Sequence, residues 1–289
     1  MLIKDYQSIG FVGAGRTALV LAHAMDDAGY TVKAVASRSI ESAKMLAAGI
    51  SRCEAYSHVE KVVDDCDVVF VTVPDDAIRM VADSLPWREG QAAVHCSGAL
   101  PIEVLDTPLR MGAQIGGLHP FQTFPIGQDA NHWLPGSSFA TEASGRLGDW
   151  LEEMVRRIGC QSVSIAPENR SLYHLTAVLS CGFVTTLLDV SCELWEGMGF
   201  SRDEALQALL PLVQGTLNSI RAKGTWQAAT GPVMRADIGT LQKHLVSLAE
   251  HAPDVLPLYR EAGRRMVRMA HRNQVVTQEA AERMELLLT

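Results

Sequence analysis

The chain has 289 residues, of which 47% are apolar and 20% charged, and its formal net charge is −8. This is the composition of an ordinary soluble globular protein, and the length predicts about two domains. The acidic balance argues against nucleic acid or an anionic membrane as a partner. Six cysteines occur without C-x-x-C or other metal-like spacing, so we expect free thiols, no metal site and a cytoplasmic location.

The first informative stretch is residues 9–18, a short apolar run followed by a glycine turn and the start of a helix. Gly13, Gly15 and Ala18 match the G-x-G-x-x-A form of the dinucleotide fingerprint, which places a pyrophosphate at a helix N-terminus. The pattern predicts a Rossmann fold; the alternative is a structural turn without a ligand. The predicted cofactor contacts of this loop are Gly13, Gly15, Arg16, Thr17 and Ala18.

The rest of the first half alternates apolar strands with amphipathic helices, which predicts a doubly wound parallel sheet of the α/β class. We expect strands at 30–36, 67–73, 91–96, 112–118, 138–141 and 162–165. From residue 168 onward only helices are expected, at 168–197, 201–223, 232–251, 255–272 and 277–287. The predicted domains are a Rossmann cofactor domain, 1–166, and an all-helical substrate and dimerisation domain, 167–289.

No membrane segment or signal peptide is expected. The longest uncharged apolar run, residues 175–188, has 14 residues, which is too short to span a bilayer. The N-terminal apolar segment is interrupted by the glycine loop.

The end of the second predicted strand favours NADP over NAD. NAD-binding domains place a carboxylate there for the ribose 2′-hydroxyl, whereas NADP-binding domains place a cation for the 2′-phosphate. Here Ser37, Arg38 and Ser39 occupy the position, and a guanidinium suits a phosphate. The alternative is that Arg38 is a solvated surface charge and Ser39 an ordinary helix cap.

Three further strand ends would meet at the cofactor's reactive ring, because ligands bind beyond the carboxyl ends of the strands. They carry Val73-Pro74, Ser97 and His119. His119 is the one group at these ends that titrates near neutrality, so we predict that it exchanges a proton with the substrate. Ser97 is predicted to orient either His119 or the substrate. The alternative for His119 is a loop histidine that bonds only to backbone. His95 is expected inside a strand and not to act as an acid or base.

A polar stripe on the predicted helix 232–251 would face the substrate, with Arg235 at the helix start holding a carboxylate. The alternatives are a solvated stripe and, for His174, a core histidine. The predicted substrate contacts are Gln122, Thr123, His174, Arg235, Asp237 and His244.

Several motifs together resemble one protein family. They are Gly13-x-Gly15-x-x-Ala18, Val71-Thr72-Val73-Pro74-Asp75, His95-Cys96-Ser97-Gly98, His119-Pro120-x-Gln122-Thr123-Phe124 and Gly231-Pro232-x-x-Arg235-x-Asp237. The family is a poorly characterised bacterial one, in which a Rossmann-like domain precedes a helical domain of unknown function. It is related to pyrroline-5-carboxylate reductase, 6-phosphogluconate dehydrogenase and deazaflavin-dependent NADP reductases. The resemblance implies a 6-phosphogluconate dehydrogenase-like fold.

Ser97 and His119-Pro120 also resemble prephenate dehydrogenase, where such a pair serves the substrate hydroxyl, and the resemblance implies catalytic roles for both. One position departs from the family pattern: Ser180-Cys181 stands where the family usually has Ser-Asn. An amide that would contact cofactor or substrate is therefore absent. The full prephenate-binding set is also absent, so that substrate is not implied.

Together these features predict an NADP-dependent oxidoreductase that transfers hydride to or from a small C–O or C–N substrate bound between the domains. An imine reductase is one form of this prediction. The alternative from another class is a non-catalytic NADP(H) sensor. Apolar side chains on the predicted helices, with Trp195 and Leu210 among them, predict a homodimer through residues after 167.

Overall fold

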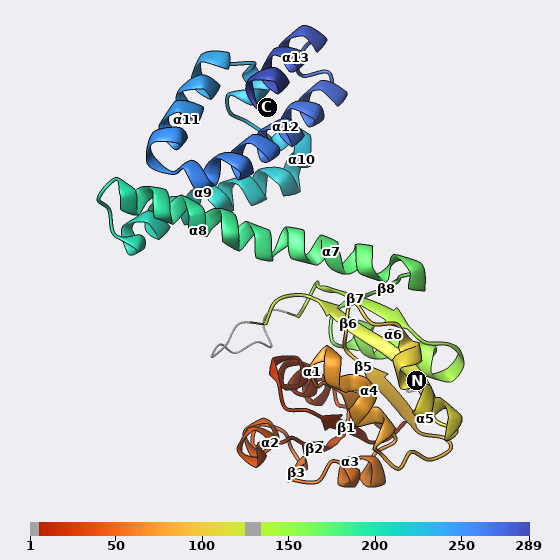
Figure 1. Ribbon diagram of the computed structural model, residues 1–289. Coiled ribbons are helices and arrows are strands. Elements are labelled where there is room, and N and C mark those ends of the chain that lie inside the picture. Colours follow the sequence, from red (N-terminus) through yellow and green to blue (C-terminus); the bar gives the residue numbers. More distant parts are fainter. Residues whose placement is uncertain (1–5, 125–133) are drawn as a thin grey trace. The chain divides into compact units, whose positions relative to one another are not determined.

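The computed structural model describes residues 6–124 and 134–289. The chain forms two compact units, Met1–Cys181 and Gly182–Thr289 (Figure 1). The boundary expected at 166–167 marks the end of the last strand. The helix that follows it, α7 (Arg170–Ser180), belongs to the first unit because it hydrogen-bonds to the sheet through Arg170 and Tyr173.

The first unit contains an eight-stranded sheet in the order β3-β2-β1-β4-β5-β6-β7-β8. The first six strands follow the dinucleotide-binding order, which confirms the predicted fold class. The strands are β1 (Ile9–Val12), β2 (Val32–Ala36), β3 (Glu54–Tyr56), β4 (Val68–Val71), β5 (Ala92–His95), β6 (Gln114–Phe121), β7 (Ser138–Glu142) and β8 (Gln161–Ser164).

The sheet is parallel except between β6 and β7, which pair antiparallel with His119 opposite Ala140. The predicted parallel sheet therefore contains one antiparallel pair of strands. An antiparallel neighbour needs no crossover helix, and residues 122–137 connect the two strands. Strand β6 is also longer than predicted, so His119 and Pro120 lie within it instead of after it.

Helices cover both faces of the sheet, and each face has its own core. Alternate residues of β1 enter opposite cores: Phe11 packs with Leu21 and Trp150, whereas Val12 packs with Ile78. The helices are α1 (Arg16–Asp27), α2 (Ile40–Ala47), α3 (Glu60–Asp65), α4 (Asp75–Asp83), α5 (Asp106–Arg110) and α6 (Gly145–Arg157). Strand β3 and α3 were not predicted, since such short elements carry little periodicity.

The second unit is helical, as predicted, around a small core that includes Val233, Leu241, Val267 and Met284. Its helices are α8 (Gly182–Gly197), α9 (Arg202–Lys223), α10 (Thr225–Ala228), α11 (Ile238–His251), α12 (Leu256–Arg272) and α13 (Gln278–Leu287). The long helix predicted at 168–197 is divided at Cys181, whose φ of −119° and ψ of −71° depart from helical values.

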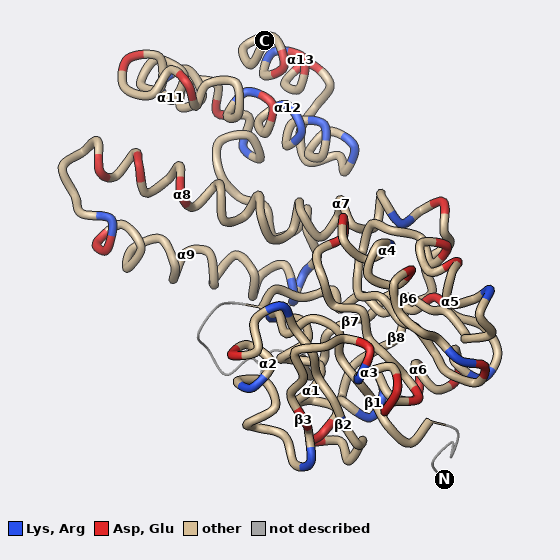
Figure 2. The backbone as a smooth tube through the Cα atoms, turned by 60° about the horizontal axis from the view of Figure 1, so that its bottom comes forward, with Lys and Arg blue, Asp and Glu red and all other residues tan. Residues whose placement is uncertain are grey.

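One stretch among the described residues, Pro167–Gly197, is long and apolar enough to cross a membrane by length and composition. Its best window has a mean hydropathy of 1.7 and is only 6% buried. The length argument against a span, which considered only residues 175–188, was therefore wrong. Residues 171–188 and 205–220 carry no Lys, Arg, Asp or Glu, so much of α7 and α9 is drawn in tan (Figure 2). Such an uncovered apolar surface marks a place of interaction.

Candidate active site

The glycine loop is held tightly against the end of β4. Gly13 has a φ of +107°, and a Cβ added to it would lie 2.6 Å from the Thr72 carbonyl oxygen. Thr72 in turn donates its hydroxyl to the Gly13 carbonyl at 2.9 Å. Both the backbone conformation and the close approach therefore require glycine at position 13.

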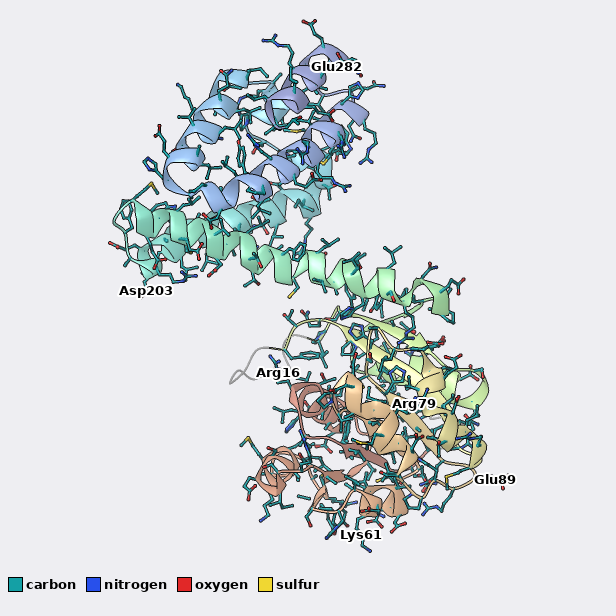
Figure 3. The ribbon with its side chains drawn as sticks, in the orientation of Figure 1. Arg16, Lys61, Arg79, Glu89, Asp203 and Glu282 are labelled. Carbon is teal, nitrogen blue, oxygen red and sulfur yellow. The ribbon has the colours of Figure 1, made fainter. Side chains whose placement is uncertain are left out.

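Helix α1 begins with open N–H groups. Its N-cap is Gly15, no side chain caps it, and its first turn contains no acidic residue. Such an end favours an anion. Ala18 is fully buried in the core, as the close helix–strand packing of the fingerprint demands. Arg16, labelled in Figure 3, donates to the Phe124 carbonyl at 3.1 Å, and Thr17 is half-buried beside it.

The three residues after β2 divide into two roles. Arg38 is exposed and forms no ion pair with any described residue. Ser39 is the N-cap of α2: its Oγ accepts from the Ser42 N–H at 3.2 Å and donates to Glu41. The capping alternative for Ser39 is thus realised in the structure. Ser37 lies half-buried before them, and contact of the three with a cofactor stays a prediction.

Ser97 bonds to Asp75 instead of to His119. Its hydroxyl donates to the Asp75 carboxylate at 2.6 Å, and its oxygen accepts from the backbone N–H groups of Ala99 and Leu100. Asp75 opens α4 directly after Val73 and Pro74, so this hydrogen bond joins the ends of β4 and β5. Of the two predicted roles of Ser97, orienting His119 is not realised, because the Ser97 proton is directed to Asp75; orienting the substrate stays a prediction.

His95 is fully buried at the end of β5, and its Nδ1 accepts from the Ser97 backbone N–H at 3.2 Å. Burial lowers the pKa of His95 to about 4, and the Arg170 charge acts in the same direction. His95 is therefore neutral at physiological pH and supports the Ser97 turn.

His119 is oriented by Tyr173 of α7. Its Nδ1 lies 3.0 Å from the Tyr173 hydroxyl oxygen, and the two rings meet edge to face. The His174 ring lies 6.0 Å from the His119 ring, centroid to centroid. Because β6 runs past the end of β5, His119 also reaches Gly98, where an added Cβ would lie 2.7 Å from His119 Nε2.

Burial lowers the pKa of His119 to about 4; His174 and Arg170 contribute in the same direction, and Asp75 opposes them. His119 is therefore neutral at physiological pH, and the expected titration near neutrality is wrong. Burial also raises the pKa of Tyr173 to about 12, against a backbone hydrogen bond from Ala140 and the charge of Arg170. Both rings are uncharged, so they act through hydrogen bonds.

A buried ion pair anchors α7 to the sheet. Arg170, which is 3% exposed, pairs with Glu142 at the end of β7 and donates to the Ser97 carbonyl at 3.0 Å. Burial raises the pKa of the Glu142 carboxyl, an effect that the neighbouring guanidinium opposes. Arg170 thereby connects the Ser97 turn with the helix that carries Tyr173.

Asp75, Arg170 and Tyr173 also belong to this cluster and were not predicted from the sequence. Asp75 follows a strand end and could have been found there. Tyr173 and Arg170 gave no signal, because nothing in the sequence shows that α7 returns to the sheet.

The predicted substrate residues are scattered over both units. Gln122 is exposed after β6 and donates to Ser137 at 3.1 Å, Thr123 is exposed beside it, and His174 lies near His119. Only His174 joins the cluster around His119.

The other three predicted substrate residues lie in the helical unit. Helix α11 begins at Ile238, because Ala236 takes a left-handed φ of 51° after a short 3-10 turn. Asp237 is its N-cap and accepts from Thr240, and His244 lies 2.8 Å from the Tyr259 hydroxyl. The helix start predicted near 232 was wrong, and Arg235 is exposed ahead of the helix.

No group of three or more metal-ligating side chains occurs within residues 6–124 and 134–289. Hydrogen-bonding side chains gather around the ends of β4, β5 and β6.

The sequence matches two family models, a Rossmann-like domain over residues 2–120 and the domain of unknown function DUF2520 over residues 137–266. No protein of curated function matches it.

Solved structures resemble the chain over nearly its full length. A candidate NADP oxidoreductase of Bacteroides fragilis is 25% identical with a TM-score of 0.74, and the match covers 91% of this chain and 98% of that one. A reductive aminase of Aspergillus terreus, solved with NADPH, is 14% identical with a TM-score of 0.62, covering 98% and 92%. A pyrroline carboxylate reductase of Plasmodium falciparum, with NADP bound, is 13% identical with a TM-score of 0.57, covering 99% of each chain.

The two distant enzymes show that the fold is shared, and the two family models cover most of the sequence between them. The resemblance inferred from the motifs is confirmed: this chain consists of a Rossmann-like domain followed by a DUF2520 helical domain.

Proposed function

We propose that the protein is an NADP-dependent oxidoreductase that transfers hydride to or from a small C–O or C–N substrate. The observation that carries the proposal is the hydrogen bond between His119 and Tyr173, located where a Rossmann sheet binds its ligand. A neutral histidine held by a phenol, beside the Ser97–Asp75 pair, is suited to hydrogen-bond a substrate oxygen or nitrogen.

The residues around the glycine loop fit an NADP molecule. Gly13 forms a tight cradle against Thr72, and α1 presents uncapped N–H groups to the phosphates. Arg38, exposed after β2, is the proposed ligand of the 2′-phosphate. When bound, the nicotinamide supplies or accepts the hydride. The names of the B. fragilis, A. terreus and P. falciparum proteins support the same cofactor.

The protein's own groups hold the substrate and move the proton. His119 contacts the heteroatom next to the reacting carbon, and Ser97 with Asp75 forms the polar edge beside it. In the helical unit, exposed Arg235 is the proposed ligand of a substrate carboxylate, with His244 and Asp237 near it in sequence. Cys53, Cys66, Cys96, Cys160 and Cys192 form no disulfide within the described residues, which supports the proposed cytoplasmic location.

The experiment is a two-step assay. NADPH and NADH are first titrated against the protein, and a metabolite extract is then added while nicotinamide absorbance is followed. The proposal expects tighter binding of NADPH and a change in absorbance that depends on the protein. Binding without turnover over a broad extract would instead identify an NADP(H) sensor, and the absence of binding would refute both.

We also propose that the protein is a homodimer joined through α7, α8 and α9. Large apolar side chains on these helices are exposed to an unusual degree for a single chain. The most exposed of them are Leu172 at 62%, Leu179 at 48%, Phe183 at 53%, Leu187 at 49%, Leu210 at 52%, Leu212 at 67% and Leu217 at 52%. A second copy of the same apolar surface would cover them.

Light scattering at micromolar protein tests this assembly. A dimer mass is expected, and Leu212→Glu together with Phe183→Glu should reduce it to the monomer mass. A wild-type monomer that co-sediments with lipid vesicles would overturn the dimer and identify these helices as a membrane surface.

A further inference from the structure

The direction of the hydrogen bond between Tyr173 and His119 follows from the surroundings of the phenol. Among the described residues, the Tyr173 hydroxyl has no hydrogen-bond acceptor other than His119 Nδ1. Its own proton remains for His119 Nδ1, which lies 3.0 Å away. A phenol in this position donates to the ring nitrogen.

This donation determines which nitrogen of His119 carries hydrogen. A neutral imidazole has one N–H and one acceptor nitrogen, and burial keeps the ring neutral because it lowers the His119 pKa to about 4. If Nδ1 accepts, Nε2 must carry the hydrogen. The Nε2 edge of the ring lies against Gly98, at the Ser97 turn where the strand ends meet.

We propose that Tyr173 is a positioning residue that holds His119 in the Nε2–H form and makes it a donor to the substrate. This inference rests on the proposed function and adds the direction of the reaction to it. A histidine held as a donor is prepared for reduction of a C=O or C=N group, whereas oxidation of an alcohol or amine would need an acceptor at Nε2.

The protons balance without forming an imidazolate. During reduction the substrate carbon takes the hydride, and the π electrons move to its oxygen or nitrogen. That atom takes the proton from His119 Nε2, while the Tyr173 O–H bond breaks and Nδ1 takes its proton. His119 ends neutral with hydrogen on Nδ1. Burial disfavours the Tyr173 phenolate and the Arg170 charge only partly offsets this, so the phenolate is reprotonated by water.

Nitrogen-15 NMR of histidine-labelled protein measures the tautomer directly. The spectrum of the His119→Asn variant assigns the His119 signals. At neutral pH the wild type should show a protonated Nε2 and a hydrogen-bonded, unprotonated Nδ1. Tyr173→Phe should move the Nδ1 signal to that of an unbonded nitrogen or mix the two tautomers. Tyr259→Phe removes the matching hydroxyl from His244 and should leave the His119 signals unchanged.

A wild-type His119 with hydrogen on Nδ1 would overturn the inference, and so would Tyr173→Phe without any change at Nδ1. Circular dichroism of each variant checks that it is folded. Since the NMR measurement needs no substrate, it tests the tautomer of His119 independently of the proposed enzymatic activity. Once a substrate is known, Tyr173→Phe should lower kcat about tenfold. In H2O–D2O mixtures, the dependence of the rate on the D2O fraction should change from that of two transferred protons to that of one.

Discussion

Among the described residues, each unit contains one histidine–tyrosine hydrogen bond, and the two bonds differ in their surroundings. In the sheet unit, His119 is partly buried against Gly98, His174 and the Arg170–Glu142 pair. In the helical unit, His244 is exposed on α11 and meets Tyr259 of α12 with the same edge-to-face geometry. The contact is the same, but only the first pair lies at strand ends among other polar groups.

The two pairs share the contact, and burial raises the pKa of both phenols, so the surroundings of the histidine distinguish the first pair from the second. Burial lowers the pKa of His119 to about 4 and raises that of Tyr173 to about 12. It requires a dense scaffold, which the sheet unit supplies through a core on each face. The helical unit has one small core, and the apolar side chains of α8 and α9 remain exposed.

The largest expected effect comes from His119→Asn, which removes the donor at the buried pair. Turnover should fall by about 10²–10⁴, the usual contribution of a general acid or base, while NADPH binding persists because the glycine loop is untouched. Steady-state kinetics with the substrate that the extract assay identifies measures the loss of turnover. His251→Asn on the exposed end of α11 is the control. Near-full activity in the His119 variant would place the proton donor elsewhere, with His174 the next candidate.

The second prediction concerns the scaffold of the buried pair. Arg170→Met leaves the Glu142 carboxylate buried without its partner, which should lower the free energy of unfolding by about 3–5 kcal/mol. Chemical denaturation measures the loss. Arg265→Met, which breaks an ion pair whose side chains are 76% and 51% exposed, should cost less than about 1 kcal/mol.

Because an apolar replacement of both partners removes the uncompensated charge, Arg170→Met with Glu142→Leu should recover most of the lost stability. If Arg170→Met alone lowers the free energy of unfolding no more than Arg265→Met does, the ion pair does not anchor α7.

A third prediction follows from the lowered pKa values of His95 and His119. Both are about 4 in the folded protein against 6.5 for the free side chain. As the pH falls, the unfolded chain takes up protons first, so stability is complete above pH 6.5 and is lost toward pH 4. Each group contributes at most about 3 kcal/mol over this window.

Denaturation midpoints between pH 7 and pH 4 measure this loss, and His119→Asn should remove about half of it. The exposed His244 makes a suitable comparison, since His244→Asn should leave the slope between pH 6.5 and 4 largely as it is. An unchanged slope in the His119 variant would contradict the burial argument.

The smallest expected effect is on cofactor choice. Arg38→Ala should weaken NADPH by about 1–3 kcal/mol, or about tenfold or more, and NADH much less, because only NADPH carries the 2′-phosphate. Fluorescence titration measures both constants. Lys61→Ala, an exposed cation on α3 (Figure 3), is the control, and equal losses for both cofactors would remove Arg38 from the 2′-phosphate site.

Local patterns were sufficient for the fold class and for the glycine turn between β1 and α1. The glycine spacing at 13–18 and the apolar runs of β1, β4 and β5 reflect backbone geometry and burial within a few residues, so they are readable in sequence. The match of the Rossmann-like model to residues 2–120 agrees with them. The boundaries failed where one residue changed the backbone, as at Cys181 and Ala236.

The partners of the reactive side chains were decided only by tertiary structure. The sequence indicated His119 and Ser97 but not their partners, whereas the fold joins Ser97 to Asp75 and His119 to Tyr173. These bonds connect residues 22 and 54 positions apart, and no periodicity within one element encodes them. The pKa of His119 likewise depends on desolvation by the assembled sheet and α7, which exists only once the chain has folded.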